Sequence, residues 1–184
     1  LDGFLKSLEI DINVRIEDEK QRELASIIKV SEISEGLVME DERVKVTALK
    51  VVHGLLENCF AFKFETKDKK VVFSGDTIYF PPLIEFSKDA DLLVHEVMLE
   101  RGINVLAERL KKVKPNLIDH LMISHTTAED AAKLAKEANV KHMVFNHYVP
   151  HIPKEFPNSE FVDAAKRVWD GKITAGYDLC EIDF

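Results

Sequence analysis

Residues 71–77, with the sequence VVFSGDT, place a short apolar strand directly before a polar turn. Val and Phe are typical of a buried strand, and Asp76 in the turn can act as a metal ligand. Four more apolar runs end in residues that can bind a metal or move a proton. They are VVH at 51–53, LLVHE at 92–96, LMISH at 121–125 and MVFNH at 143–147.

Open α/β sheets gather their binding sites at the carboxyl ends of their strands. If these five ends converge, three histidines and two carboxylates surround one pocket. The candidate site residues are His53, Asp76, Glu96, His125 and His147. Neutral imidazole and carboxylate together suit zinc, with iron or manganese as alternatives.

Each of these residues, taken alone, also has an ordinary structural explanation. Asp76 could cap the turn after its strand, as aspartate often does. For His53 in isolation, a hydrogen-bonded core histidine is the favoured interpretation. His147 could be a loop residue, and Glu96 a surface charge. The repeated placement at strand ends favours a shared site over unrelated coincidences.

The apolar periodicity along the chain predicts an α/β layered fold. The expected strands are 44–52, 59–66 with Phe60, Phe62 and Phe64 on one face, 71–73, 92–94, 121–124, 143–145 and the tail 177–184. The expected helices are 103–112, 128–138 and one that starts at Asn158 or Ser159, and a weak helical pattern covers 4–10. Thr126 and Glu129 fit a capping box, which predicts that Thr126 caps the helix that follows.

Composition limits the classes of partner. The chain has 184 residues, 46% of them hydrophobic, which is enough for a sizeable core. Its net charge of −8 argues against generic binding to nucleic acid or to an anionic membrane. No apolar run is long enough to span a bilayer, so no membrane partner is expected. Lys111, Lys112 and Lys114 form a small basic cluster, for which a solvated helix end is favoured over an RNA site. Cys59 and Cys180 are expected to be free thiols in the reducing cytoplasm.

Four motifs, in this order and at this spacing, resemble the metallo-β-lactamase superfamily and, within it, the ribonuclease Z and arylsulfatase-like branch. They are SGDT at 74–77, ADLLVHEVM at 90–98, ISHTTAEDAAKLA at 123–135 and MVFNH at 143–147. The resemblance implies an αββα sandwich made of two similar halves. Residues 44–184 would be the C-terminal half, and residues 1–43 a lead-in segment of the N-terminal part.

The resemblance also implies a role for each candidate residue. Asp76 matches the aspartate that bridges two divalent metal ions, with zinc as the first choice. His147 matches the late histidine ligand of the second ion, and His53 matches, more loosely, the middle histidine ligand of the first. Glu96 and His125 match a catalytic pair in which the glutamate orients the histidine and the histidine assists the leaving group. Such a carboxylate–imidazole pair fixes the tautomer and raises the basicity of the ring.

The sequence departs from the family in one large respect. It contains no HxHxDH motif, which supplies the remaining metal ligands and the expected water-activating base, whereas a catalytic zinc usually has three protein ligands. We therefore expect an N-terminal half of the same polypeptide or a partner chain to complete the site, and the chain starts at Leu1 rather than at Met. Half a sandwich would expose an apolar sheet face, with Phe60, Phe62 and Phe64 as candidates, and a homo-oligomer would also cover it.

Two functions from different classes follow. The first is the C-terminal portion of a dinuclear metal-dependent hydrolase that cleaves a phosphodiester or a sulfate ester, with a small ester or an RNA as substrate. The alternative is a non-catalytic half-domain that acts as an assembly or interaction module. Hydrolysis of a small diester by the completed protein would distinguish the two.

Overall fold

The computed structural model describes residues 2–184, which divide between Ile33 and Ser34 into two compact units. The first unit holds three helices, α1 (Asp2–Ser7), α2 (Glu9–Glu19) and α3 (Leu24–Ile27), none with a buried residue. Helix α2 ends where Lys20 adopts a left-handed conformation, with φ of 56°. The weak helical pattern in the first residues is therefore confirmed.

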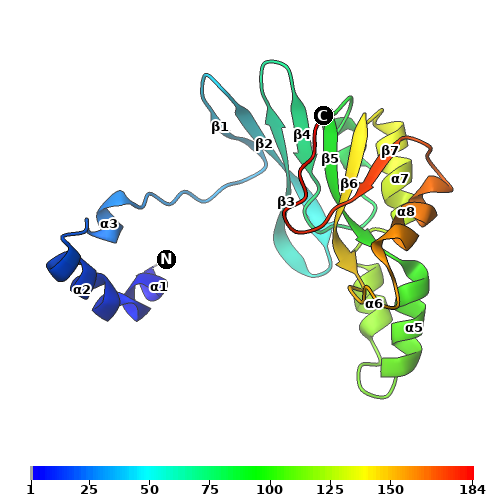
Figure 1. The fold of residues 1–184 in the computed structure, drawn as a ribbon, viewed down its shortest axis with the longest axis horizontal. Coiled ribbons are helices and arrows are strands. Elements are labelled where there is room, and N and C mark those ends of the chain that lie inside the picture. The colour runs from blue at the N-terminus through cyan, green and yellow to red at the C-terminus, as the bar shows by residue number, and fades with distance from the viewer. Residues whose placement is uncertain (1) are drawn as a thin grey trace. The chain divides into compact units, whose positions relative to one another are not determined.

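The second unit is built on one seven-stranded sheet whose spatial order follows the chain (Figure 1). Its strands are β1 (Gly36–Glu40), β2 (Lys45–His53), β3 (Leu56–Glu65), β4 (Lys70–Phe73), β5 (Leu92–Met98), β6 (His142–Val149) and β7 (Lys172–Ala175). Strands β1 to β4 pair antiparallel, and β4 to β7 pair parallel. The carboxyl ends of the parallel strands therefore meet at one edge, where the sequence places the candidate site.

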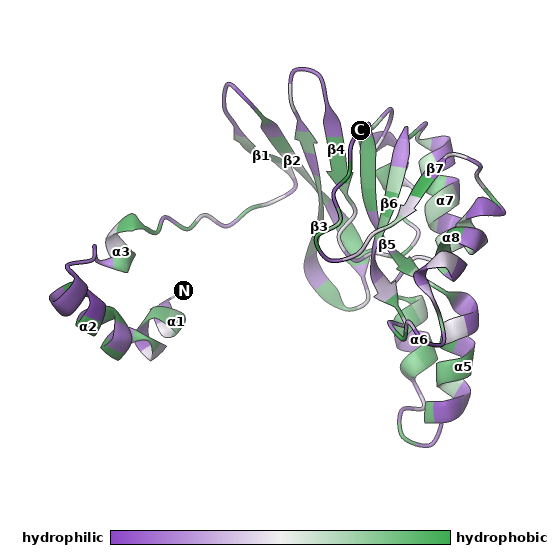
Figure 2. Ribbon diagram, in the orientation of Figure 1, coloured by the Kyte–Doolittle hydropathy of each residue, from purple (hydrophilic) through white to green (hydrophobic). Residues whose placement is uncertain are grey.

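The connections between the parallel strands supply five helices. They are α4 (Pro82–Phe86), α5 (Glu100–Leu110), α6 (Leu117–Met122), α7 (Ala128–Glu137) and α8 (Asn158–Lys166). Helix α7 buries a row of small side chains, namely Ala128, Ala131, Ala132 and Ala135 together with Leu134. Small residues let α7 lie close to the sheet, and hydrophobic residues are concentrated in the strands and the inner helix faces (Figure 2).

The core lies between the helices and one face of the sheet. It includes Val72 and Leu93 from the strands and Phe161 from α8. On the other face, Val94 and Val144 line a hollow together with the C-terminal segment that contains Cys180 and Ile182.

That other face carries the aromatic residues expected from the sequence. Phe62 is paired with Phe73 in the ladder, and the rings of Phe64 and Phe73 pack edge to face. Phe60, Phe62 and Phe64 are half-buried, and Phe73 is 41% exposed. A partly exposed aromatic row on a central sheet is therefore present in the second unit.

Two expected strands are wrong. Residues 121–124 do not form a strand, because α6 runs to Met122 and the amides of Ser124 and His125 bond back to the carbonyl oxygen of Leu121. A short apolar run such as LMIS is ambiguous between helix and strand, and here Leu117 and Leu121 supply a helical spacing. The tail after β7 is irregular as well, because Lys172–Ala175 occupies the sheet position beside β6.

Three boundaries also differ from the expectations. Thr127, and not Thr126, caps α7 by accepting a hydrogen bond from the amide of Asp130 at 3.2 Å. Strand β5 continues past His95 and Glu96 to Met98, so both residues lie inside the strand. The second unit begins at Ser34, ahead of the expected boundary at residue 44, because β1 pairs with β2.

None of the helices in residues 2–184 combines the length and the apolar character that a membrane span needs.

His95 predicts how stability depends on pH. The side chain is fully buried in β5, and burial lowers its pKa from the ordinary 6.5. Below pH 6.5 the unfolded chain binds a proton at this residue that the folded chain does not, so the free energy of unfolding falls as the pH falls. We expect a slope of about 1.4 kcal/mol per pH unit from this one group.

Denaturant unfolding between pH 7 and 5 measures this slope, and His95→Gln should flatten it. Burial and the nearby Lys172 also lower the pKa of His142. His142 therefore accounts for any fall in the free energy of unfolding that remains in the variant. An unchanged slope in His95→Gln would show that another group titrates.

Candidate active site

The turn after β4 presents Asp76 at the edge of the sheet. Gly75 has φ of +61°, and a β-carbon there would lie 2.5 Å from the carbonyl oxygen of Phe60. Only glycine fits this conformation without strain. The chain therefore turns sharply over β3 at Gly75 and leaves the Asp76 carboxylate 40% exposed.

Glu96 holds together the segments that surround the site. It is 1% exposed, and its Oε1 accepts hydrogen bonds from the amides of Thr77 and Thr126, each at 3.1 Å. The same oxygen lies 3.2 Å from Nδ1 of His125. An explanation of Glu96 as a surface charge is wrong, since this carboxylate links the turn after β4 to the start of α7.

The contact with Glu96 fixes the orientation of His125. Because a carboxylate oxygen accepts, Nδ1 of His125 donates, and Nε2 is the ring nitrogen left for other partners. The His125 ring lies between two other imidazoles, with centroid distances of 5.1 Å to His53 and 5.5 Å to His147. Three of the expected histidines therefore converge.

His147 lies at an irregularity in β6. The pairing of β5 with β6 steps from Glu96–Asn146 to Val97–Tyr148, so His147 is the extra residue of a bulge. Its φ is +42°, which is uncommon for a residue with a side chain. Bulges and strained residues are concentrated at functional sites, where they redirect a side chain. Here the redirected ring places Nε2 at 3.4 Å from Oδ2 of Asp76.

His53 ends β2 beside the segment that carries His125. Its Nδ1 lies 2.7 Å from the carbonyl oxygen of Ser124. A carbonyl oxygen only accepts, so Nδ1 donates and Nε2 is the ring nitrogen left for other partners. A histidine that binds a metal usually donates its second nitrogen to a carbonyl or carboxylate in this manner.

These donors fit a metal only in part. Two ligands of a tetrahedral zinc at about 2.0–2.1 Å lie roughly 3.3 Å apart, close to the spacing of Asp76 and His147. His53 has a suitable tautomer but is not gathered with this pair. Across residues 2–184, no three His, Cys, Asp or Glu side chains cluster tightly enough to hold a metal ion. The second unit thus offers a pair of donors and a neighbouring histidine, and a catalytic zinc needs more.

Sequence reasoning missed the hydrogen-bonding residues around Glu96. Thr77 and Thr126 supply the amides that Glu96 binds, and the Thr126 hydroxyl donates to the carbonyl oxygen of Thr77. The signal available was a threonine directly after each of two candidate residues, Asp76 and His125. His95, next to Glu96 on β5, donates from Nδ1 to the backbone oxygen of Glu96 at 2.7 Å.

Removal of the Glu96 carboxylate should destabilise the fold. In Glu96→Ala the buried amides of Thr77 and Thr126 lose their acceptor, at about 1–3 kcal/mol each. We expect the free energy of unfolding to fall by about 2–5 kcal/mol. Glu96→Gln keeps an acceptor oxygen and should cost less than half as much. Denaturant unfolding measures both, with the exposed Glu57→Ala as control. Equal stability of the Ala and Gln variants would contradict the proposed hydrogen bonding.

Comparison with known proteins identifies the family. Residues 9–148 match the family model described as the beta-lactamase superfamily domain, and the chain therefore belongs to this family. Two relatives are informative. A ribonuclease Z of Mycobacterium marinum is 28% identical over 184 residues, which is 100% of this chain and 63% of that relative. A zinc phosphodiesterase ELAC protein 2 homolog of Caenorhabditis elegans is 32% identical over 119 residues, 65% of this chain and 12% of that relative.

Solved structures show the same fold. The metallo-beta-lactamase fold protein YhfI of Bacillus subtilis superposes with a TM-score of 0.60 at 19% identity, over 88% of this chain and 60% of that one. Human tRNase Z, short form, superposes with a TM-score of 0.53 at 21% identity, over 80% of this chain and 44% of that one. The mixed sheet with its helices is thus a metallo-β-lactamase fold, and the chain spans less than two thirds of the M. marinum ribonuclease Z and of both solved structures.

Proposed function

We propose that this chain is part of a metal-dependent hydrolase that cleaves phosphodiester bonds. The observation that carries the proposal is the convergence of the buried Glu96–His125 pair with Asp76 and His147 at the carboxyl edge of the parallel strands. Relatives called ribonuclease Z and zinc phosphodiesterase support the phosphodiester as the bond cleaved.

Asp76, His147 and His53 would hold the metal, with Asp76 shared by two ions. Zinc is the first choice, because imidazole and carboxylate suit it and a relative is called a zinc phosphodiesterase. Such ions, when bound by these residues, would polarise the phosphate and activate a water molecule at neutral pH.

Glu96 and His125 would serve the leaving group. Because Nδ1 of His125 donates to Glu96, Nε2 is the ring nitrogen that would carry the proton for the leaving group. His125 gives that proton to the departing oxygen, and Glu96 keeps the ring in the orientation needed for the transfer. Glu96 therefore acts through His125, whereas His125 acts on the substrate.

We further propose that polypeptide beyond this sequence completes the site. The donors present are too few for two ions, and no HxHxDH occurs in the chain. The half-buried aromatic row of β3 and β4 gives such a segment an apolar face to cover. An N-terminal half of the same polypeptide is favoured, with a partner chain or a second copy as alternatives.

The free thiols support a reducing compartment, which favours the cytoplasm. Cys59 and Cys180 form no disulfide in the described part of the chain.

The test uses the complete native polypeptide, expressed from its whole coding sequence. We expect hydrolysis of bis-p-nitrophenyl phosphate that a chelator abolishes and added zinc restores. p-Nitrophenyl sulfate, as the sulfate-ester comparison, should be cleaved far more slowly. Absence of hydrolysis of both esters by a folded, metal-loaded protein would contradict the enzyme proposal and favour a non-catalytic interaction module.

A further inference from the structure

We propose that the tip of the α5–α6 hairpin binds the phosphate backbone of an RNA whose scissile phosphate lies at the candidate active site. The tip is residues 108–116, with the sequence ERLKKVKPN. This inference rests on the proposed function and adds a binding surface to it.

Both ends of the hairpin are anchored in the candidate site. Helix α5 starts at Glu100, four residues after Glu96 on β5, and the amide of Leu99 bonds to the carbonyl oxygen of Val149 at the end of β6. Helix α6 leads within three residues into His125, and its Ile123 carbonyl oxygen accepts from the amide of Gly54, next to His53. The two ends of this hairpin therefore adjoin the residues proposed to act on the phosphate.

The hairpin projects beyond the ends of the strands (Figure 1). Its first helix has 11 residues, which at 1.5 Å per residue gives a length of about 16 Å. That length corresponds to about five phosphate spacings of a stacked strand. One RNA strand can thus reach the tip and the site together.

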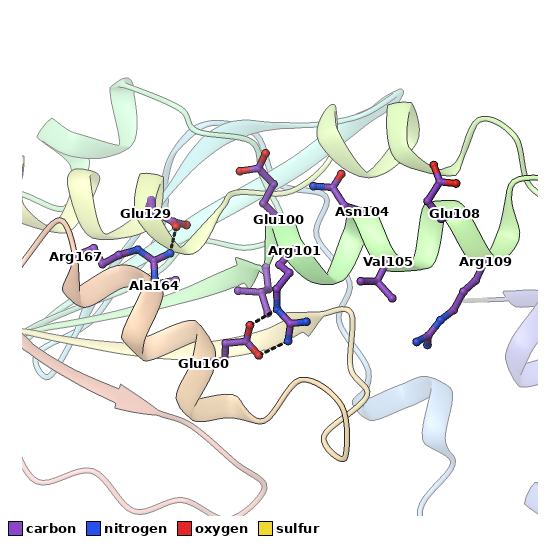
Figure 3. A pocket seen from close by; sticks show the side chains of 11 residues that line it. Glu100, Arg101, Asn104, Val105, Glu108, Arg109, Glu129, Glu160, Ala164 and Arg167 are labelled. Atoms are coloured by element: carbon purple, nitrogen blue, oxygen red, sulfur yellow. Dashed lines mark hydrogen bonds and ion pairs between the residues drawn. The ribbon is translucent and has the colours of Figure 1, made fainter.

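Ion pairs hold α5 in place along its length. Arg101, in the first turn, contacts both carboxylate oxygens of Glu160 on α8, at 2.6 and 2.7 Å. Arg109, in the last turn, contacts both oxygens of Glu155 in the same way. Figure 3 shows the Arg101–Glu160 pair in the groove between α5, α7 and α8. Two bidentate pairs at opposite ends of one helix restrict its rotation, so the tip is presented in a defined direction.

The charge of the tip is opposite to that of the chain. Residues 108–116 contain four basic residues and one acidic residue, whereas the whole chain has a net charge of −8. Arg109 is neutralised by Glu155. The Nζ of Lys111 lies 3.9 Å from Oε1 of Glu108, which is a long ion pair. Lys112 and Lys114 form no ion pair with any described residue of the chain. Free ammonium groups on an acidic protein are available to phosphates and attract a polyanion locally.

This placement changes the interpretation of the lysine cluster as a solvated helix end. The sequence alone shows three lysines after a helix, but the structure puts them at the tip of a fixed arm that starts and ends at the site. An anionic membrane is the less suitable ligand, since Val113, 77% exposed, is the apolar side chain among the lysines and interfacial binding needs a larger apolar area.

The experiment compares two triple variants of the complete native polypeptide. The test variant is Lys111→Ala, Lys112→Ala and Lys114→Ala. The matched control is Lys67→Ala, Lys88→Ala and Lys136→Ala, which changes the net charge equally at the edge where β4, β5 and β6 begin. Binding of a fluorescein-labelled single-stranded RNA is followed by anisotropy, extrapolated to zero time, over a series of salt concentrations.

We expect the test variant to lose affinity for the RNA by roughly a hundredfold at 0.1 M salt. The slope of log affinity against log salt concentration should become smaller by about 2, because each lost phosphate contact removes about 0.7 from that slope. The control should bind within about twofold of the parent, and both variants should hydrolyse bis-p-nitrophenyl phosphate as the parent does.

Three results would overturn the inference: a parent that does not bind RNA, a test variant that keeps its affinity and salt slope, or an equal loss in the control. A test variant that no longer sediments with vesicles of three parts phosphatidylcholine to one part phosphatidylserine, but still binds RNA, would assign the tip to a membrane. That result would overturn the inference as well. A parent that binds RNA but never hydrolyses the diester contradicts the proposed function alone.

Discussion

Replacing Asp76 with alanine in the complete polypeptide should remove the bound metal and reduce diester hydrolysis by at least about a thousandfold. The reason is that Asp76 is proposed as the shared ligand of both ions, and a catalytic metal supplies several kcal/mol of transition-state stabilisation. Asp76 is exposed at the sheet edge, so its truncation should leave the fold intact. Metal content by mass spectrometry and turnover of bis-p-nitrophenyl phosphate measure the two effects.

Asp68→Ala is the matched control. Asp68 is an exposed aspartate in the turn between β3 and β4, at the edge of the sheet opposite the site. It should retain its metal and its activity. A folded Asp76→Ala protein that retains the full metal content would show that Asp76 is a turn-capping residue and not a ligand.

Replacing His125 with alanine should separate metal binding from turnover. We expect the metal content to be unchanged and the rate to fall by roughly a hundred- to ten-thousandfold, the usual effect of losing a general acid. His125 is oriented by Glu96 through Nδ1, and its Nε2 is free to act on a leaving group. The loss should be smaller for a substrate with a good leaving group, such as p-nitrophenolate, than for an RNA, because a good leaving group needs less protonation.

His120→Ala on α6 is the control for His125. It removes an exposed imidazole from the helix that leads into the site and should alter neither metal content nor rate. If His125→Ala loses the metal, then His125 is a ligand and its proposed role is wrong.

The positions of the strands that carry the site could be predicted because their sequences are apolar, short and bounded by polar turns. Strands β4, β5 and β6 each contain a run of β-branched or large apolar residues, and the parallel arrangement follows from the helices between them. The placement of Asp76 and His147 at one edge was predictable for the same reason, because β4 and β6 are parallel strands of one sheet.

The sequence predicts the wrong type of element for the segment that leads to His125. A strand at 121–124 was expected, but α6 delivers His125 from a hairpin. The four-residue apolar run has no alternation that distinguishes a helix from a strand. The carbonyl oxygens of Ile123 and Ser124 accept hydrogen bonds from the Gly54 amide and from Nδ1 of His53, and these tertiary contacts decide the outcome. Long-range contacts of this kind leave no signal in the local sequence.

The bulge at His147 was likewise outside the reach of sequence patterns. A residue with φ of +42° in the middle of β6 breaks the alternation of a strand, yet the letters MVFNHYV contain no glycine to indicate it. The strained conformation is maintained by the pairing of β5 with β6 on either side. Its consequence, the contact of His147 with Asp76, is the geometry that the proposed metal site depends on.

The proposed metal site is tested most directly by an anomalous diffraction map of the complete polypeptide, recorded at the zinc, iron and manganese absorption edges. We predict a peak at about 2.0–2.2 Å from both the Asp76 carboxylate and Nε2 of His147, with a second peak that shares Asp76. The remaining ligands should come from residues outside this sequence. A metal-loaded, active protein whose peaks lie away from Asp76 and His147 would contradict the proposed metal site.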